Sequence, residues 1–379
     1  MIKVLSILGT RPEVIKMAPV LQRLQRINGI ESQVCTTSQH RAMQDQMMHL
    51  FGLQANYDLD VMKHNQDLFY LTREMLMHLQ KVLQEAKPDL VLVQGDTTTS
   101  FVGALAAFYS QVRVGHIEAG LRTHNLLAPF PEEANRQLTG RLATFHFAPT
   151  EMAKRHLLQE GISENRILVT GNTVIDALLW MRRHFDMARI QVALPVHILH
   201  LIEQHYPYVL ITGHRRENFG NGFLSICRAI QTLITRYPNW NFVYPVHLNP
   251  NVRKPVFELL SGYTNMHLIE PVDYEPFVYL MDHCKIVLTD SGGVQEEAPS
   301  LKKPVLVMRK VTERSEGIEA GLAKLVGTSE YNLVREVSEL IDNEKTYQRM
   351  VNGINPYGDG TAAQQIVNFI DKSLCIAGG

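Results

Sequence analysis

The sequence lacks the features that mark membrane, secreted or nucleic-acid-binding proteins. Its 379 residues carry a formal net charge of -1 with 20% charged residues, so no overall field favours nucleic acid or an anionic membrane. No apolar run is long enough to span a bilayer, and the first residues have no basic segment or cleavage site typical of a signal peptide. We therefore expect a cytoplasmic protein with no nucleic-acid and no membrane partner.

Cysteine is scarce and widely spaced. The four cysteines are Cys35, Cys227, Cys284 and Cys375, and none forms a CxxC pair. This spacing argues against a disulfide scaffold or a zinc ribbon and indicates a reducing compartment with buried or neutral thiols. The histidines show no HExxH pattern and no other metal-ligand spacing, so we expect no metal site.

The usual nucleotide fingerprints are also missing. No GxxxxGK[ST] segment is present, and the match to GxGxxA, "GDGTAA" at residues 358–363, follows a turn near the C-terminus. A dinucleotide-binding loop should instead follow the first strand of a βαβ unit. We therefore expect no bound NAD and no P-loop nucleotide site.

What the sequence does contain is a regular alternation of short apolar runs with helical patterns. Because several runs are apolar on both faces, they predict parallel strands covered by helices on both sides of a sheet. A chain of this length exceeds one core, so we expect an α/β protein with two doubly wound, Rossmann-type domains. The twelve predicted strands are "IKVLSIL", "SQVCTT", "DLVLVQG", "VRVGHIEA", "FHFAPT", "RILVTGN", "YVLITG", "NFVYPVH", "MHLIEPV", "KIVLTD", "PVLVMR" and "AKLVG".

The strand rhythm breaks between about residues 180 and 206, where two helical segments and a loose connection are predicted. This break predicts an N-terminal domain over residues 1–180 and a C-terminal domain over residues 206–361, joined by a linker at 181–205. The last segment, "AAQQIVNFIDKSL", predicts an amphipathic helix that could pack on either domain.

Ligands of open parallel sheets bind beyond the carboxyl ends of the strands, and charged residues gather there in the first half. Arg11 and Lys16 follow the first strand, Asp96 follows "LVLVQG", and Glu118 ends "VGHIEA". Asp96 is equally well explained as a helix N-cap. Glu118 is harder to explain structurally, because a carboxylate at the end of an apolar strand needs a partner.

The stretch "PFPEEANRQ" adds Glu132 and Arg136 at i and i+4 of a predicted helix. A surface ion pair is the default interpretation of that spacing. Taken alone, the pair indicates nothing about function.

The second half supplies groups suited to binding an anion. "TGHRREN" places His214, Arg215 and Arg216 after one strand, and "LTDSGGVQEE" places a Ser-Gly-Gly loop between a strand and a helix. Small residues there allow backbone amides to approach a phosphate at the helix N-terminus. Glu297, further into that helix, is compatible either with hydrogen bonds from ribose hydroxyls or with simple solvation.

Carboxylates in one domain and phosphate donors in the other suit a nucleoside-diphosphate sugar held in a cleft between two domains. Arg11 would then add a permanently charged, bidentate donor for the diphosphate. This explains why an arginine stands where a dinucleotide-binding loop would carry glycines.

With these stretches side by side, the chain resembles the bacterial non-hydrolysing UDP-N-acetylglucosamine 2-epimerases. The resemblance covers nearly the whole chain in order. The matching stretches are "GTRPEVIKMAPV", "QGDTTT", "HIEAGLRT", "PFPEEANRQLTG", "TGNTVIDALL", "TGHRREN", "YPVHLNPNVR", "LTDSGGVQEEAPSL", "KPVLVM" and "NPYGDG".

The resemblance implies a GT-B-like fold with the active site in the cleft between the domains and helix 362–379 completing the first domain. It implies interconversion of UDP-GlcNAc and UDP-ManNAc without an external cofactor, in a homodimer. The carboxylates implied at the sugar are Asp96, Glu118 and Glu132, next to Arg136. The residues implied at the diphosphate or neighbouring groups are Arg11, Lys16, His214, Ser291, Gly292, Gly293 and Arg314, with Phe277 at the uracil and Glu297 at the ribose.

Bacterial members of the family also bind a second UDP-GlcNAc as an allosteric activator. The corresponding region here contains Gln39, His40, Arg215 and His247. Two other classes of function remain open from the residues alone, a GT-B glycosyltransferase with the same donor and a non-catalytic nucleotide-sugar sensor.

Overall fold

The computed structural model describes residues 1–37, 41–61, 63 and 66–375, and divides into two compact units. The first unit comprises residues 1–177 and 357–379, and the second comprises residues 178–356. Residues 181–205, the predicted linker, form the end of α7 together with α8 and α9 and belong to the second unit. No helix of the described residues is long and apolar enough to cross a membrane.

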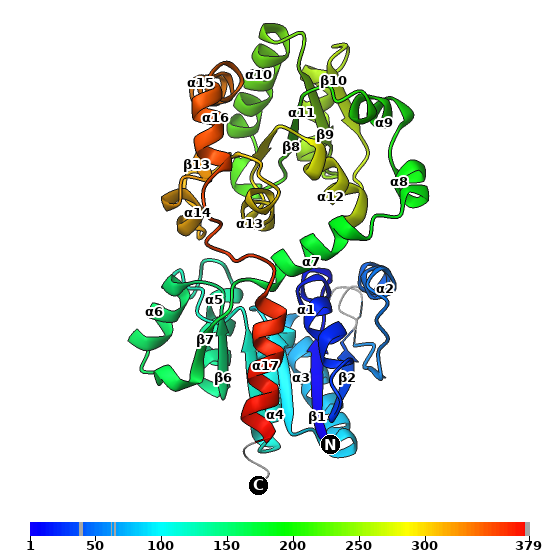
Figure 1. The fold of residues 1–379 in the computed structure, drawn as a ribbon, viewed down its shortest axis with the longest axis vertical. Coiled ribbons are helices and arrows are strands. Elements are labelled where there is room, and N and C mark those ends of the chain that lie inside the picture. The colour runs from blue at the N-terminus through cyan, green and yellow to red at the C-terminus, as the bar shows by residue number, and fades with distance from the viewer. Residues whose placement is uncertain (38–40, 62, 64–65, 376–379) are drawn as a thin grey trace. The chain divides into compact units, whose positions relative to one another are not determined.

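The first unit is built on a parallel seven-stranded sheet with the order β3-β2-β1-β4-β5-β6-β7 (Figure 1). Its strands are β1 (Ile2–Leu8), β2 (Ile30–Thr36), β3 (Tyr57–Asp58), β4 (Leu90–Gln94), β5 (Arg113–Ile117), β6 (Phe145–Ala148) and β7 (Ile167–Val169). Its helices are α1 (Arg11–Leu24), α2 (Arg41–Leu50), α3 (Leu68–Ala86), α4 (Thr98–Tyr109), α5 (Glu132–Leu142), α6 (Glu151–Gln159), the start of α7 (Thr173–Arg183) and α17 (Ala362–Cys375), with a short 3₁₀ turn at Glu164–Arg166.

The second unit is built on a parallel six-stranded sheet with the order β10-β9-β8-β11-β12-β13. Its strands are β8 (Tyr208–Thr212), β9 (Asn241–Pro245), β10 (Met266–Ile269), β11 (Ile286–Thr289), β12 (Val305–Val307) and β13 (Ala323–Leu325). Its helices are α8 (Met187–Ala193), α9 (Val196–Glu203), α10 (Asn221–Arg236), α11 (Pro250–Leu260), α12 (Tyr274–His283), α13 (Gly292–Ser300), α14 (Ser315–Glu319), α15 (Glu330–Asp342) and α16 (Glu344–Val351), with a 3₁₀ turn at Arg216–Asn218.

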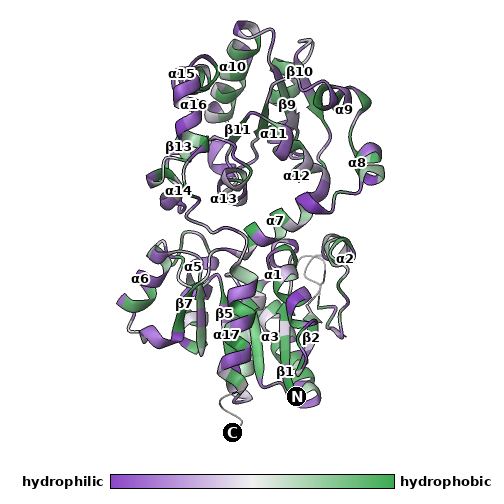
Figure 2. Cartoon of the chain, viewed as in Figure 1, coloured by the Kyte–Doolittle hydropathy of each residue, from purple (hydrophilic) through white to green (hydrophobic). Residues whose placement is uncertain are grey.

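All twelve predicted strands are present, and the prediction of two doubly wound sheets is confirmed. Strand β3 was not predicted, because its two residues are too few to show an alternation pattern. Figure 2 colours much of β1 as hydrophobic, as expected for a central strand of a sheet with both faces covered.

Each sheet lies between two layers of helices. In the first unit α3 and α4 pack against one face, while α1 and α17 lie together and Phe369 of α17 packs edge-on against Phe145 and Phe147 of β6. In the second unit α10, α11 and α15 bury one face. On the other face Tyr208 of β8 donates a hydrogen bond to the carbonyl of Leu280 in α12.

The C-terminal helix is fixed to the first unit by a buried carboxylate. The side chain of Asp176 accepts hydrogen bonds from the amides of Ala362 (3.2 Å) and Ala363 (3.0 Å), which begin α17. Nearby, the carbonyl of Tyr357 accepts from the amide of Asn172 at 2.7 Å. Of the two domains on which this helix could pack, the structure therefore selects the first.

Strand order reverses at one place in each sheet, between β1 and β4 and between β8 and β11. Such switch points leave a crevice beyond the carboxyl ends of the two strands, because the flanking connections run to opposite sides. The charged stretches noted in the sequence follow these four strands and β5, which lies next to β4.

Candidate active site

The "GTRPE" turn after β1 is organised by Glu13, a residue that the sequence pattern alone did not single out. Oε2 of Glu13 accepts hydrogen bonds from the amides of Gly9 (3.0 Å) and Thr10 (2.6 Å) and from Oγ1 of Thr10 (2.8 Å). This is the return half of a capping box, and the T-x-x-E spacing was the signal that could have revealed it. Arg11 follows at the start of α1, partly exposed.

Glu13 also connects this turn to the next strand end. Its Oε1 accepts a hydrogen bond from Oγ1 of Thr97 at 2.7 Å, and Thr97 directly follows Asp96. The side chain is 1% exposed, and burial raises the pKa of Glu13 to about 7 against the opposing effect of these hydrogen bonds. One buried carboxyl group therefore fixes the loops that carry Arg11 and Asp96.

Glu118 lies at the centre of a polar cluster at the end of β5. Its carboxylate contacts Lys16 Nζ at 2.6 and 2.7 Å, Nδ2 of Asn172 at 3.0 Å and Nε2 of Gln94. The residue is 7% exposed and has a φ of +64°, in the left-handed region that few side chains adopt. Backbone conformations of this kind persist where the surrounding contacts enforce them, and they concentrate at functional sites.

Asp96 is not the N-cap of α4, because Thr97 holds that position and accepts from the amide of Ser100. Instead, Oδ2 of Asp96 lies 2.5 Å from a guanidinium nitrogen of Arg136. The same guanidinium contacts Glu133 at 3.2 Å. Arg136 is therefore a buried link between two carboxylates of the first unit.

The prediction of a surface ion pair between Glu132 and Arg136 is wrong, because the Arg136 guanidinium contacts Asp96 and Glu133 instead. The spacing could not reveal this, because Asp96 comes from a different strand end. Glu132 begins α5, and its Oε2 is buried with no hydrogen-bond partner among the described residues. A buried carboxylate oxygen without a partner is costly unless a ligand supplies one.

In the second unit, His214 and Asp290 face one another across the switch point of the sheet. His214 follows β8 and Asp290 follows β11, and Nδ1 of His214 lies 3.7 Å from Oδ1 of Asp290. The ring of His247 stacks on that of His214 with centroids 5.3 Å apart and an interplanar angle of 17°. Burial lowers the pKa of His214, with His247 and Arg215 acting in the same direction and Asp290 opposing them.

The Ser-Gly-Gly stretch forms the predicted strand-to-helix turn. Ser291 is the N-cap position of α13, and Gly292 and Gly293 are its first residues. A Cβ atom at Gly292 would lie 2.9 Å from Cζ of Arg314, so a larger residue would displace the guanidinium. Helix N-terminus and arginine are thus adjacent, as an anion site requires.

Arg314 belongs to a chain of alternating charges. Its Nε lies 2.8 Å from Glu296 and its guanidinium also contacts Glu313. Glu313 lies 2.9 Å from Arg309, which contacts Glu217 at 2.7 Å. Burial would raise the pKa of Glu313, but the two arginines lower it to about 2.

Glu297 is 6% exposed, which excludes the solvated surface carboxylate that the sequence left open. Its Oε1 accepts a hydrogen bond of 3.0 Å from the hydroxyl of Tyr274. Tyr274 begins α12, the helix that also carries the partly buried Phe277. Tyr274 was not singled out in the sequence, because nothing in its local pattern differs from a core aromatic.

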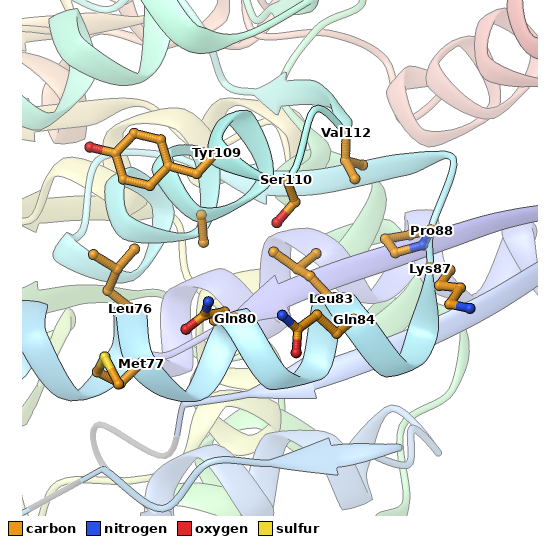
Figure 3. Close-up of a pocket in the computed structure, with 11 residues that line it drawn as sticks. Leu76, Met77, Gln80, Leu83, Gln84, Lys87, Pro88, Tyr109, Ser110 and Val112 are labelled. Carbon is orange, nitrogen blue, oxygen red and sulfur yellow. The ribbon is translucent and has the colours of Figure 1, made fainter.

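A cavity of about 700 Å³ lies elsewhere, between α3 and α4 (Figure 3). Pro88 and Val112, which line it, precede β4 and β5. The cavity therefore lies at the amino ends of these strands, whereas the charged residues follow their carboxyl ends. Its other lining residues are chiefly apolar or uncharged. Lys87 is its one charged lining residue, and none of the arginines, histidines or carboxylates described above lines it.

Among the other predicted positions, Gln39 and His40 lie outside the described residues, while Arg215 and His247 lie beside His214. Within the described residues, no group of three or more histidine, cysteine, aspartate or glutamate side chains is arranged to hold a metal ion.

Two doubly wound sheets, each with charged groups beyond the switch point, define a GT-B-like protein. MurG from Acinetobacter baumannii shares this fold, with a TM-score of 0.60 at 14% identity over 98% of this chain and 100% of that one. The UDP-N-acetylglucosamine 2-epimerase family model matches residues 22–371.

The chain therefore belongs to the UDP-N-acetylglucosamine 2-epimerase family, and the family assigned from the motifs is confirmed. UDP-N-acetylglucosamine 2-epimerase of Escherichia coli K12 is 50% identical over 98% of this chain and 99% of its own length. A crystal structure of UDP-GlcNAc 2-epimerase from Neisseria meningitidis bound to UDP-GlcNAc is 51% identical and superposes with a TM-score of 0.86, covering 98% and 100% of the two chains.

Proposed function

We propose that this chain interconverts UDP-GlcNAc and UDP-ManNAc by eliminating UDP to form 2-acetamidoglucal and then adding UDP back. The observation that carries the proposal is the presence in the first unit of Asp96 and Glu118 after the adjoining strands β4 and β5, and of Glu132 at the start of α5, in a chain of this family. A passive binding site would gain little from three ionisable carboxyl groups.

The C2 proton of an unoxidised sugar is not acidic enough for a carboxylate to remove directly. When the C1–O bond breaks and UDP leaves with its electron pair, positive charge develops at C1 and acidifies C2–H. A carboxylate then takes the proton, which gives the C1–C2 double bond of the glucal. Protonation of C2 from the opposite face and attack of UDP on C1 give the epimer, with all atoms accounted for.

Two carboxyl groups on opposite faces of C2 are the minimum for this reaction. We propose that two of Asp96, Glu118 and Glu132 exchange the proton and that the third positions the sugar. Of the three, Glu118 carries the densest set of donors and Glu132 has an unpartnered buried oxygen. This contrast favours Glu132 as one of the two exchanging groups and Glu118 as the positioning group.

Positioned acid–base groups typically contribute about 10²–10⁴-fold each, so stabilisation of the leaving diphosphate must supply much of the rest. We assign this task to Arg11, His214, Arg314 and the amides of Ser291, Gly292 and Gly293. Phe277 would contact the uracil, and Glu297 would accept hydrogen bonds from the ribose hydroxyls.

We further propose a homodimer, a second UDP-GlcNAc bound as an activator near Arg215 and His247, and a role in supplying ManNAc for bacterial surface polysaccharides. These follow from the family resemblance. Light scattering of the purified chain tests the dimer, and a sigmoidal dependence of rate on UDP-GlcNAc tests the activator.

The decisive experiment is incubation of the purified protein with UDP-GlcNAc in D₂O, followed by NMR of C2 and the anomeric signals without added cofactor or acceptor. UDP-ManNAc with deuterium at C2 is the expected product. Accumulation of free ManNAc and UDP would mean a hydrolysing epimerase. Binding without turnover would mean a sensor, and sugar transfer to an added acceptor would mean a glycosyltransferase.

A further inference from the structure

Asp290 is a fully buried residue whose two carboxylate oxygens have different surroundings. It follows β11 and is 0% exposed. Its Oδ2 accepts hydrogen bonds from the amides of His214 (2.9 Å) and Arg215 (2.8 Å) and from Nδ2 of Asn218 (3.2 Å). One oxygen of Asp290 therefore fixes the backbone of the loop that carries His214.

The second oxygen is in a different situation. Oδ1 of Asp290 is buried without a hydrogen-bond partner in the part of the chain that the structure describes. Nδ1 of His214 lies 3.7 Å from it. A buried ionised oxygen needs a hydrogen-bond donor or a cation, and the imidazole of His214 stands where one is required.

We propose that Asp290 is a positioning residue for His214, holding its Nδ1–H and favouring the imidazolium so that Nε2 is presented to the leaving diphosphate. This inference rests on the proposed function, which makes His214 a diphosphate-stabilising group. It adds a role for Asp290, a residue to which the family resemblance assigned none.

The other groups around His214 make Asp290 necessary. Arg215 is on the same loop, and His247 stacks on the ring from the end of β9. Both disfavour a positive charge on His214, as does its burial, while Asp290 favours it. An imidazolium is the form that best stabilises the negative charge developing on UDP as the C1–O bond breaks.

Asp290→Asn separates the two tasks of the side chain. The amide oxygen can still accept from the amides of His214 and Arg215, which preserves the loop. The amide nitrogen then faces His214 Nδ1 and, being a donor, requires that atom to be an unprotonated acceptor. Asn218→Ala is the matched control, because it removes a donor to Oδ2 and leaves Oδ1 unchanged.

The experiment is an NMR pH titration of ¹⁵N-histidine-labelled protein without substrate, for the parent, Asp290→Asn and Asn218→Ala, with His214→Asn to assign the signal. In the parent we expect neutral His214 to carry its proton on Nδ1. In Asp290→Asn we expect the pKa of His214 to fall by about one pH unit, with kcat reduced about 100-fold, KM within a few-fold and the pH profile of kcat displaced. Asn218→Ala should leave both the His214 titration and the pH profile unchanged.

A neutral His214 protonated on Nε2 in the parent would overturn the proposal without any variant. It would also be overturned if His214 titrated alike in the parent and Asp290→Asn, or if Asn218→Ala produced the same displacement. Absence of epimerase activity in the parent would refute the proposed function instead. The titration would still decide whether Asp290 controls His214.

Discussion

Lys16 Nζ lies 2.6 and 2.7 Å from the two carboxylate oxygens of Glu118, although 102 positions separate the residues in the sequence. The family resemblance implied that Lys16 contacts the diphosphate or neighbouring groups, and in the structure Lys16 contacts a carboxylate of the proposed sugar site. Both side chains are largely buried, at 15% and 5% exposed. Removing one partner of such a pair leaves an uncompensated charge.

Lys16→Met should therefore act on catalysis more than on binding. We expect kcat to fall about 100-fold, the loss typical when a substrate-positioning group is displaced, with KM for UDP-GlcNAc changed only a few-fold. Steady-state kinetics would measure both constants, with Arg11→Met as the comparison that should lower kcat and also raise KM, because Arg11 is proposed to hold the diphosphate. A rise in KM for Lys16→Met as large as that for Arg11→Met would return Lys16 to the diphosphate.

Glu132→Gln should slow exchange of the C2 proton, because it removes the acid–base group with an unpartnered buried oxygen. We expect deuterium incorporation from D₂O to slow by about 10²–10⁴-fold. The neighbouring Glu133→Gln is the control, since Glu133 is tied to the amides of Thr123 and His124. That control should lower the melting temperature and change the exchange rate less than about tenfold. Equal exchange rates in the parent and Glu132→Gln would eliminate Glu132 from proton transfer.

Tyr274→Phe should weaken recognition of the ribose. The variant keeps the ring but loses the hydroxyl that donates to Glu297 at 3.0 Å. Loss of one hydrogen bond to a charged group, about 1.5 kcal/mol, predicts an increase of about tenfold in KM for UDP-GlcNAc. The ratio of kcat/KM for UDP-GlcNAc to kcat/KM for its 2′-deoxyribose analogue should become smaller. Tyr279→Phe, on the same helix, should change neither quantity, and an unaltered ratio in Tyr274→Phe would mean that Tyr274 does not position Glu297.

Glu13→Gln should remove a pH dependence from stability. Burial raises the pKa of Glu13 from 4.5 to about 7, so between these values the folded chain holds a proton that the unfolded chain has released. The free energy of unfolding of the parent, relative to Glu13→Gln, should therefore fall as pH rises from about 5 to 8. The full shift of the Glu13 pKa corresponds to a change of about 3 kcal/mol in the free energy of unfolding.

Urea unfolding of the parent and Glu13→Gln at several pH values would measure this difference. Glu151→Gln, at an exposed position of α6, provides the control and should track the parent. A constant difference between the parent and Glu13→Gln across this pH range would show that Glu13 does not titrate there.

The sequence by itself determined the two sheets, because strands buried on both faces must be apolar along their length and the twelve runs display this directly. It also determined that Asp96, Glu118, His214 and the Ser-Gly-Gly turn stand at strand ends. In each parallel sheet the carboxyl ends of the strands lie on the same side, where ligands bind. These positions could therefore be selected as candidate site residues from the sequence pattern alone.

Only the tertiary structure decided what each of these side chains contacts. Lys16 with Glu118, Arg136 with Asp96, Tyr274 with Glu297 and Asp290 with His214 pair residues from different strand ends or helices. Local spacing suggested that Arg136 pairs with Glu132. In the structure Arg136 instead contacts Asp96 and Glu133, because a long side chain can reach acceptors that are distant in the sequence. Contacts of this kind depend on strand order and crossover geometry, which periodicity along one chain does not encode.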